Sequence, residues 1–113
     1  MKSFKFIGGK LSEENLLRFN ETPILHSVTH LDFSDNIIFD QRMTPFLDGF
    51  NSKNLLKLNL RNCGCSYESL KHLFSNQHFN SLRDIDLSQN YDLDLFVRDL
   101  AKTQNLNKLR RLS

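Results

Sequence analysis

The sequence has no long apolar run and no tryptophan. Residues 1–15 contain no apolar stretch of the length that a secretory signal needs, and no later segment is long enough to span a bilayer. Ten phenylalanines supply large apolar side chains that need no polar partner in a core. The two cysteines, Cys63 and Cys65, are separated by one residue, so a disulfide between them would be strained. We therefore expect reduced thiols and a cytoplasmic protein.

An excess of charge of either sign is also missing. Charged residues make up 25% of the chain and hydrophobic residues 39%, with a formal net charge of +2. This balance gives no reason to expect nucleic acid or an anionic membrane as a partner. A chain of 113 residues fits one domain, or one section of a longer structure.

A nine-residue phrase recurs along the chain at a constant interval. LRDIDLSQN at 82–90 matches LLKLNLRNC at 55–63 and VTHLDFSDN at 28–36, and MKSFKFIGG at 1–9 is a weaker copy. The interval is 27 residues without insertion, so the units are 1–27, 28–54, 55–81, 82–108 and a partial unit 109–113. The fourth position of the phrase reads Phe4, Leu31, Leu58, Ile85, Leu112, and the sixth reads Phe6, Phe33, Leu60, Leu87.

This phrase resembles the leucine-rich repeat, whose core spelling is L-x-x-L-x-L-x-x-N/C-x-L. The resemblance covers essentially the whole chain. It implies an α/β fold, a curved right-handed solenoid with a parallel sheet on its concave face and helices on its convex face. One repeat cannot bury its apolar face alone, whereas stacked repeats form a continuous core. Long repeats that carry helices are similar to the intracellular ribonuclease-inhibitor-like class.

After each phrase, 18 residues remain for the return to the next strand, and they carry helix signals. Ser12 and Ser66 are candidate N-caps in the first and third units, and Asp92 opens an apolar pattern in the fourth. In the second unit Thr44 is the expected N-cap and Pro45 the first helical residue, which predicts a shorter helix.

The ninth position of the phrase is held by Asn36, Cys63 and Asn90. A side chain there points into the turn that leaves the strand, where backbone polar groups need partners. Asparagine offers donors and an acceptor, and cysteine is a smaller, weaker substitute. We predict that these three residues form a structural ladder across the repeats, which Gly9 interrupts in the first unit.

Positions two, three, five, seven and eight of the phrase face outward from the predicted strands, so they form the candidate docking surface. The predicted partner-binding residues are His30, Asp32, Lys57, Asn59, Arg61, Arg83, Asp84 and Asp86. Their columns mix both signs and contain no aromatic residue, unlike a groove for nucleic acid. The same columns also fit a surface kept soluble by charge pairs such as Lys57–Asp84–Arg111, and the sequence does not separate the two interpretations.

Metal binding and catalysis are poorly supported. Cys63, Cys65, His72 and His78 are suitable zinc ligands by type, but their spacing matches no familiar site, and Cys63 already has a place in the repeat. No motif joins a nucleophile, a base and an orienting group. We predict a protein that is not an enzyme and needs no metal or cofactor.

The function predicted from these observations is a non-catalytic module that binds a protein partner through its concave, strand-lined face. Two alternatives follow from related repeat families. One is a regulator of an enzyme or a GTPase, for which Arg61 is the candidate arginine; the other is a scaffold section, as in the similar repeats of CARMIL-type actin regulators. The phrase at 109–113 stops in mid-strand, which predicts a fragment of a longer array or edge-to-edge self-association at the C-terminus.

Overall fold

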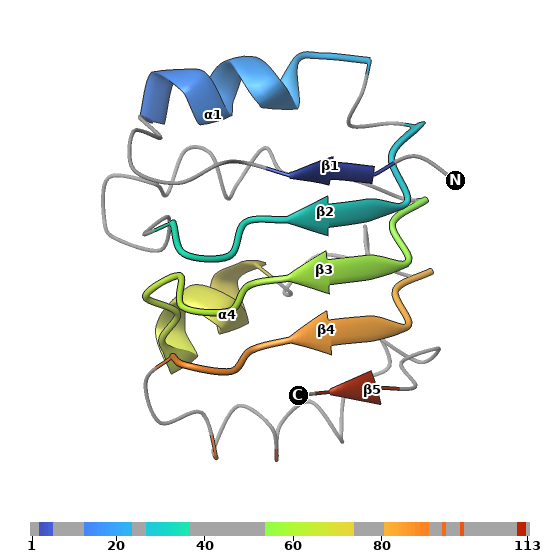
Figure 1. The fold of residues 1–113 in the computed structure, drawn as a ribbon. Coiled ribbons are helices and arrows are strands. Elements are labelled where there is room, and N and C mark those ends of the chain that lie inside the picture. The colour runs from blue at the N-terminus through green and yellow to red at the C-terminus, as the bar shows by residue number, and fades with distance from the viewer. Residues whose placement is uncertain are drawn as a thin grey trace.

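The computed structural model describes residues 3–5, 13–23, 27–36, 54–73, 81–90, 94, 98 and 111–112. Its centre is one parallel sheet with the strand order β1-β2-β3-β4-β5. The strands are β1 (Ser3–Lys5), β2 (His30–Asp32), β3 (Lys57–Asn59), β4 (Asp84–Asp86) and β5 (Arg111–Leu112). Figure 1 shows the five arrows side by side, all pointing the same way. The predicted α/β class with a parallel sheet is confirmed.

The register of the sheet follows the interval seen in the sequence. Phe4 pairs with Leu31, Leu31 with Leu58, Leu58 with Ile85, and Ile85 with Leu112. Paired residues on neighbouring strands are therefore one full repeat, 27 residues, apart in the sequence. A slip of one residue would turn the buried side chains to the opposite face, so the apolar pattern holds the register.

The core is built from the apolar columns of the phrase. At the fourth position Leu31, Leu58 and Ile85 are each at most 2% exposed. Buried residues of the first and sixth columns complete this layer, namely Val28, Leu55, Leu82, Phe33, Leu60 and Leu87. Each strand alone would leave these side chains in water, so their burial depends on the neighbouring strand.

Two helices lie in the segments where the sequence predicts them. Helix α1 (Glu13–Asn20) begins directly after Ser12, and helix α4 (Tyr67–Leu73) begins directly after Ser66. The rings of Phe19 on α1 and Phe4 on β1 have centroids 5.3 Å apart, so α1 packs on the face to which the fourth-position side chains point.

In the second and fourth units, the structure describes fewer residues of the segment that connects one strand to the next. Asp94 and Arg98 are both helical, within the segment predicted as helix in the fourth unit. The predicted helix at Thr44 and Pro45 lies outside the described residues. None of the helices in the described part of the chain combines the length and the apolarity that crossing a membrane requires.

The core column supplies a test of the stacking. Leu58, on the central strand, is 2% exposed, whereas Leu56 near the start of the same strand is half-buried. Leu58→Ala should lower the free energy of unfolding by about 2–5 kcal/mol, because it removes buried methyl groups between two neighbouring rungs. Leu56→Ala is the matched control and should cost less than half as much. Urea unfolding followed by circular dichroism measures both, and equal losses would contradict the assigned core.

Candidate functional site

A shallow groove runs across the strands on the face opposite to α1. Successive side chains of a strand point to opposite faces, so the third and fifth positions face away from the buried fourth position. The groove has a volume of about 410 Å³, and its floor is the sheet itself. We call its polar lining the strand face, defined as Ser3, Lys5, His30, Asp32, Lys57, Asn59, Asp84 and Asp86.

The strand face overlaps with the predicted docking surface but is not identical to it. Six of the eight predicted residues line the groove, namely His30, Asp32, Lys57, Asn59, Asp84 and Asp86. Arg61 and Arg83 are exposed but lie outside the lining, in the turn after β3 and just before β4. Ser3 and Lys5 belong to the groove although they were not among the predicted residues. Their place in the third and fifth columns of the repeat is the sequence feature that could have predicted their position in the groove.

Two ion pairs cross the strand face, each between neighbouring strands. Lys5 Nζ lies 3.9 Å from Asp32 Oδ2, and Lys57 Nζ lies 3.8 Å from Asp84 Oδ2. The lysine side chains are 62% and 56% exposed, whereas the carboxylate side chains are 31% and 27% exposed. Pairs this open to water contribute only about 0–1 kcal/mol. The Lys57–Asp84 part of the predicted charge row is therefore present, and the side chain of Arg111 lies outside the described residues.

His30 occupies the third position of β2, beside Lys57 of β3. Burial lowers the pKa of His30 from its ordinary value of 6.5, and the nearby Lys57 ammonium lowers it further, while Asp84 acts in the opposite direction. Its Nδ1 is hydrogen-bonded to the Thr29 hydroxyl at 2.9 Å. At neutral pH His30 is therefore an uncharged hydrogen-bonding group on the strand face.

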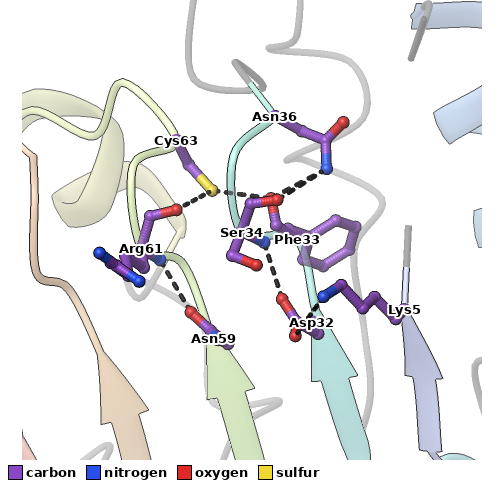
Figure 2. Close-up of polar contacts among 8 residues, drawn as sticks. All are labelled: Lys5, Asp32, Phe33, Ser34, Asn36, Asn59, Arg61 and Cys63. Atoms are coloured by element: carbon purple, nitrogen blue, oxygen red, sulfur yellow. Dashed lines mark hydrogen bonds and ion pairs between the residues drawn. The ribbon is translucent and has the colours of Figure 1, made fainter. Parts of the chain in front are cut away.

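The fifth-position side chains have a second function that the sequence analysis missed. In each of three successive repeats, Oδ1 accepts a hydrogen bond from the backbone N–H two residues later. The bonds are Ser34 N to Asp32 at 2.8 Å, Arg61 N to Asn59 at 2.9 Å and Ser88 N to Asp86 at 3.0 Å. Figure 2 shows the first two side by side. Asp and Asn commonly close turns in this way, so this column holds the chain as it leaves the strand.

The predicted ladder is clearest at Asn90. Its Nδ2 donates to the carbonyl oxygens of Leu87 (2.8 Å) and Ser88 (3.3 Å) in its own turn, and to Leu60 O of the preceding repeat at 2.8 Å. Its Oδ1 accepts from the backbone N–H groups of Cys63 (3.0 Å) and Cys65 (2.9 Å). One side chain thus links the backbones of two repeats.

Cys63 and Asn36 occupy the same ladder position in the two preceding repeats. The Cys63 thiol donates to Phe33 O at 3.0 Å, which is the counterpart of the bond from Asn90 to Leu60 (Figure 2). Asn36 Nδ2 donates to Phe33 O at 3.2 Å and to Ser34 O at 3.1 Å. The ladder role predicted for Asn36, Cys63 and Asn90 is consistent with these bonds.

The eighth position of the phrase has an unusual backbone. Asp35, Asn62 and Gln89 have φ of 64°, 54° and 62°, in the left-handed region that most residues avoid. Asp and Asn enter this region more readily than other residues with a side chain. Asn62 Nδ2 also donates to Asp35 Oδ1 at 3.1 Å, which joins equivalent positions of two repeats. The sequence signal was the recurrence of Asp and Asn before the ladder residue.

The two cysteines are free thiols in the core, and both are 0% exposed. Burial raises the pKa of Cys63 from 9.0 to about 12, and it also raises the pKa of the Cys65 thiol. Among the described residues, no three His, Cys, Asp or Glu side chains are grouped as metal ligands. His78 and the side chain of His72 lie outside that part of the chain.

Comparison of this chain with family models, with curated protein sequences and with solved structures gives no match.

Removing the Asn90 side chain tests the ladder. Asn90→Ala would leave the buried N–H groups of Cys63 and Cys65 without their acceptor, so the free energy of unfolding should fall by about 2–4 kcal/mol. Gln89→Gly is the control, because Gln89 is exposed and glycine adopts its positive φ without strain. Urea unfolding should show little change for this variant. A loss below that of the control would contradict the ladder.

The burial of the two thiols predicts that they react slowly with thiol reagents. In the folded protein, labelling of Cys63 and Cys65 by a thiol reagent at pH 8 should be roughly a thousandfold slower than in urea, because it requires opening of the core. The raised pKa of Cys63 also predicts that stability is lost between pH 9.0 and about 12, where the thiol ionises in the unfolded chain but not in the folded one. Rapid labelling without denaturant would contradict this placement.

Proposed function

We propose that this chain is a leucine-rich repeat array that binds a protein partner through its strand face, without catalysis. The observation that carries the proposal is the in-register parallel sheet, which arrays side chains of successive repeats in rows beside one groove. Such rows form an extended, rigid surface, which solenoid proteins use to bind other macromolecules. We include in this proposal that the repeats form a curved solenoid with the strand face on its concave side.

The chemistry of the strand face favours a protein over other partners. The groove is lined by ammonium, carboxylate, amide, hydroxyl and imidazole groups of mixed charge. The eight residues of the strand face include no Phe, Tyr or Trp ring on which a base could stack, and they show no basic stripe along which a phosphate backbone could lie. A mixed set of donors and acceptors matches the polar groups and both charges that a protein surface presents.

The geometry also favours binding over chemistry. Four of the five charged side chains form two partly exposed pairs, Lys5–Asp32 and Lys57–Asp84. The fifth, Asp86, accepts from the backbone N–H of Ser88, so the charges do not converge on one reacting atom. The fifth-position side chains are held by turn hydrogen bonds, so they reach a partner already oriented. A preoriented polar surface loses less conformational entropy when a partner binds.

Alanine substitutions in the third column test the proposal. The turn hydrogen bonds are made by the fifth-position side chains, so changes at His30, Lys57 or Asp84 leave the turns intact. The tagged chain is used to retain proteins from an extract of the cells that produce it, and the Kd of each purified retained protein is then measured. Lys57→Ala and Asp84→Ala should each weaken binding about tenfold or more where they contact the partner, while the melting temperature stays unchanged.

Glu68→Ala and Lys71→Ala are the matched controls, since both residues are exposed on α4. They should leave retention and Kd unchanged. If these helix variants abolish binding while the third-column variants bind normally, the strand face is not the docking surface.

A further inference from the structure

The charges of the strand face alternate in strand order. Lys5 on β1 is positive, Asp32 on β2 is negative, Lys57 on β3 is positive, and Asp84 and Asp86 on β4 are negative. Because the strands lie in sequence order and in register, these charges form successive stripes about 4.8 Å apart. The four stripes read plus, minus, plus, minus.

This pattern of charges is complementary to the same pattern on a second copy of the chain. A twofold axis parallel to the strands, placed between β2 and β3, turns a second copy so that its strands face the first in reverse order. This axis keeps third positions opposite third positions and fifth opposite fifth. Lys5 on β1 then lies opposite Asp86 on β4 of the second copy, with Asp84 two residues away. Asp32 on β2 lies opposite Asn59 on β3, with Lys57 two residues away. Every positive stripe meets a negative one, and symmetry repeats each contact.

The other simple arrangement is unfavourable. A twofold axis that runs across the strands would place β1 opposite β1 and β4 opposite β4. Lys5 would then meet Lys5, and the carboxylates of Asp84 and Asp86 would meet one another. Like charges directly across an interface are repulsive, so the charge pattern selects the first arrangement.

The existing ion pairs do not prevent this contact. The lysine tips are more than half exposed and lie 3.8–3.9 Å from their carboxylates, so they exchange partners at little cost. In the selected arrangement the third positions of β2 and β3 also face each other, which brings His30 near Lys57 of the second copy. His30 is uncharged at neutral pH, since burial lowers its pKa, so this approach brings no charge repulsion.

We infer that the strand face is self-complementary and that it binds a second copy of this chain in a twofold, face-to-face dimer held by Lys5 and Lys57 against the carboxylates of β4 and β2. This dimer uses the same surface as the proposed docking of another protein, so the two occupants compete. Arg111 on β5 pairs with Asp84 in the register of the sheet and lies beyond the four strands that face each other in the dimer.

The dimer should be weak. The facing patch consists of four strands of three residues each, about 4.8 Å apart with a rise of about 3.3 Å per residue, so it buries well below the about 1,200 Å² of most stable complexes. We expect a Kd of about 0.1–1 mM, which places the dimer among transient contacts. The groove between the two faces leaves room for bridging water.

A charge-swap experiment tests the inference on the purified chain by sedimentation equilibrium. The wild type should dimerise at low salt and dissociate as salt is raised from about 50 to 500 mM, because screening weakens exposed contacts. Lys5→Glu places two negative stripes opposite each other. The double variant Asp84→Lys/Asp86→Asn places two positive stripes opposite each other, and its Asn keeps the turn acceptor as Asn59 does on β3. Each variant alone should stay monomeric, and an equimolar mixture should recover the wild-type Kd within about threefold, since opposite charges then meet at both sites.

The matched control is Glu68→Lys mixed with Lys71→Glu, which makes equal charge changes on α4 and should leave association of either variant unchanged. Thermal unfolding confirms that each variant is folded, and Lys5→Gln and Asp84→Asn provide milder versions. A wild type that stays monomeric up to about 1 mM at low salt would overturn the inference, as would a mixture no stronger than its components.

If the single variants dimerise as well as the wild type, the contact lies elsewhere, such as the edge of the sheet, and the inference is also overturned. Association of purified copies is measured without any other protein. Its failure therefore leaves the proposed partner binding standing, and a failure of the retention experiment leaves the dimer standing.

Discussion

The hydrogen bonds that join the turn of one repeat to the backbone of the preceding repeat are the constraint from which the remaining features follow. Asn90 holds the N–H groups of Cys63 and Cys65 and the carbonyl of Leu60, which sets the spacing between two successive turns. Together with the apolar columns, this spacing holds the preceding strands in register, and Leu58 and Ile85 are neighbours. The rows of the strand face are the outer side of the same arrangement.

The sequence predicted the sheet and its core because both depend on periodicity. A constant interval of apolar residues specifies which residues are adjacent, so the spacing alone predicts that Leu31, Leu58 and Ile85 pair as neighbours. The residues of the turn ladder were predictable for a related reason. A buried turn needs a polar side chain, and Asn and Cys recur at one position of each phrase.

Features that depend on the direction of single bonds could not be predicted in this way. Periodicity placed Asp32, Asn59 and Asp86 on the outer face, but it did not show that each bends back to a backbone N–H. It also did not separate Arg61, in a turn, from the groove-lining residues. Backbone dihedral angles decide both, as they do for the left-handed residues Asp35 and Asn62.

The double role of the fifth column limits how such a surface can change its specificity. On β2, β3 and β4 one oxygen of the side chain closes a turn, so a short acceptor such as Asp or Asn is needed there, and variation at these three positions is confined to charged or neutral acceptors. The third column carries Ser3, His30, Lys57 and Asp84, four different chemistries on one scaffold. New recognition properties should therefore be engineered in that row, one repeat at a time, with the fold left intact.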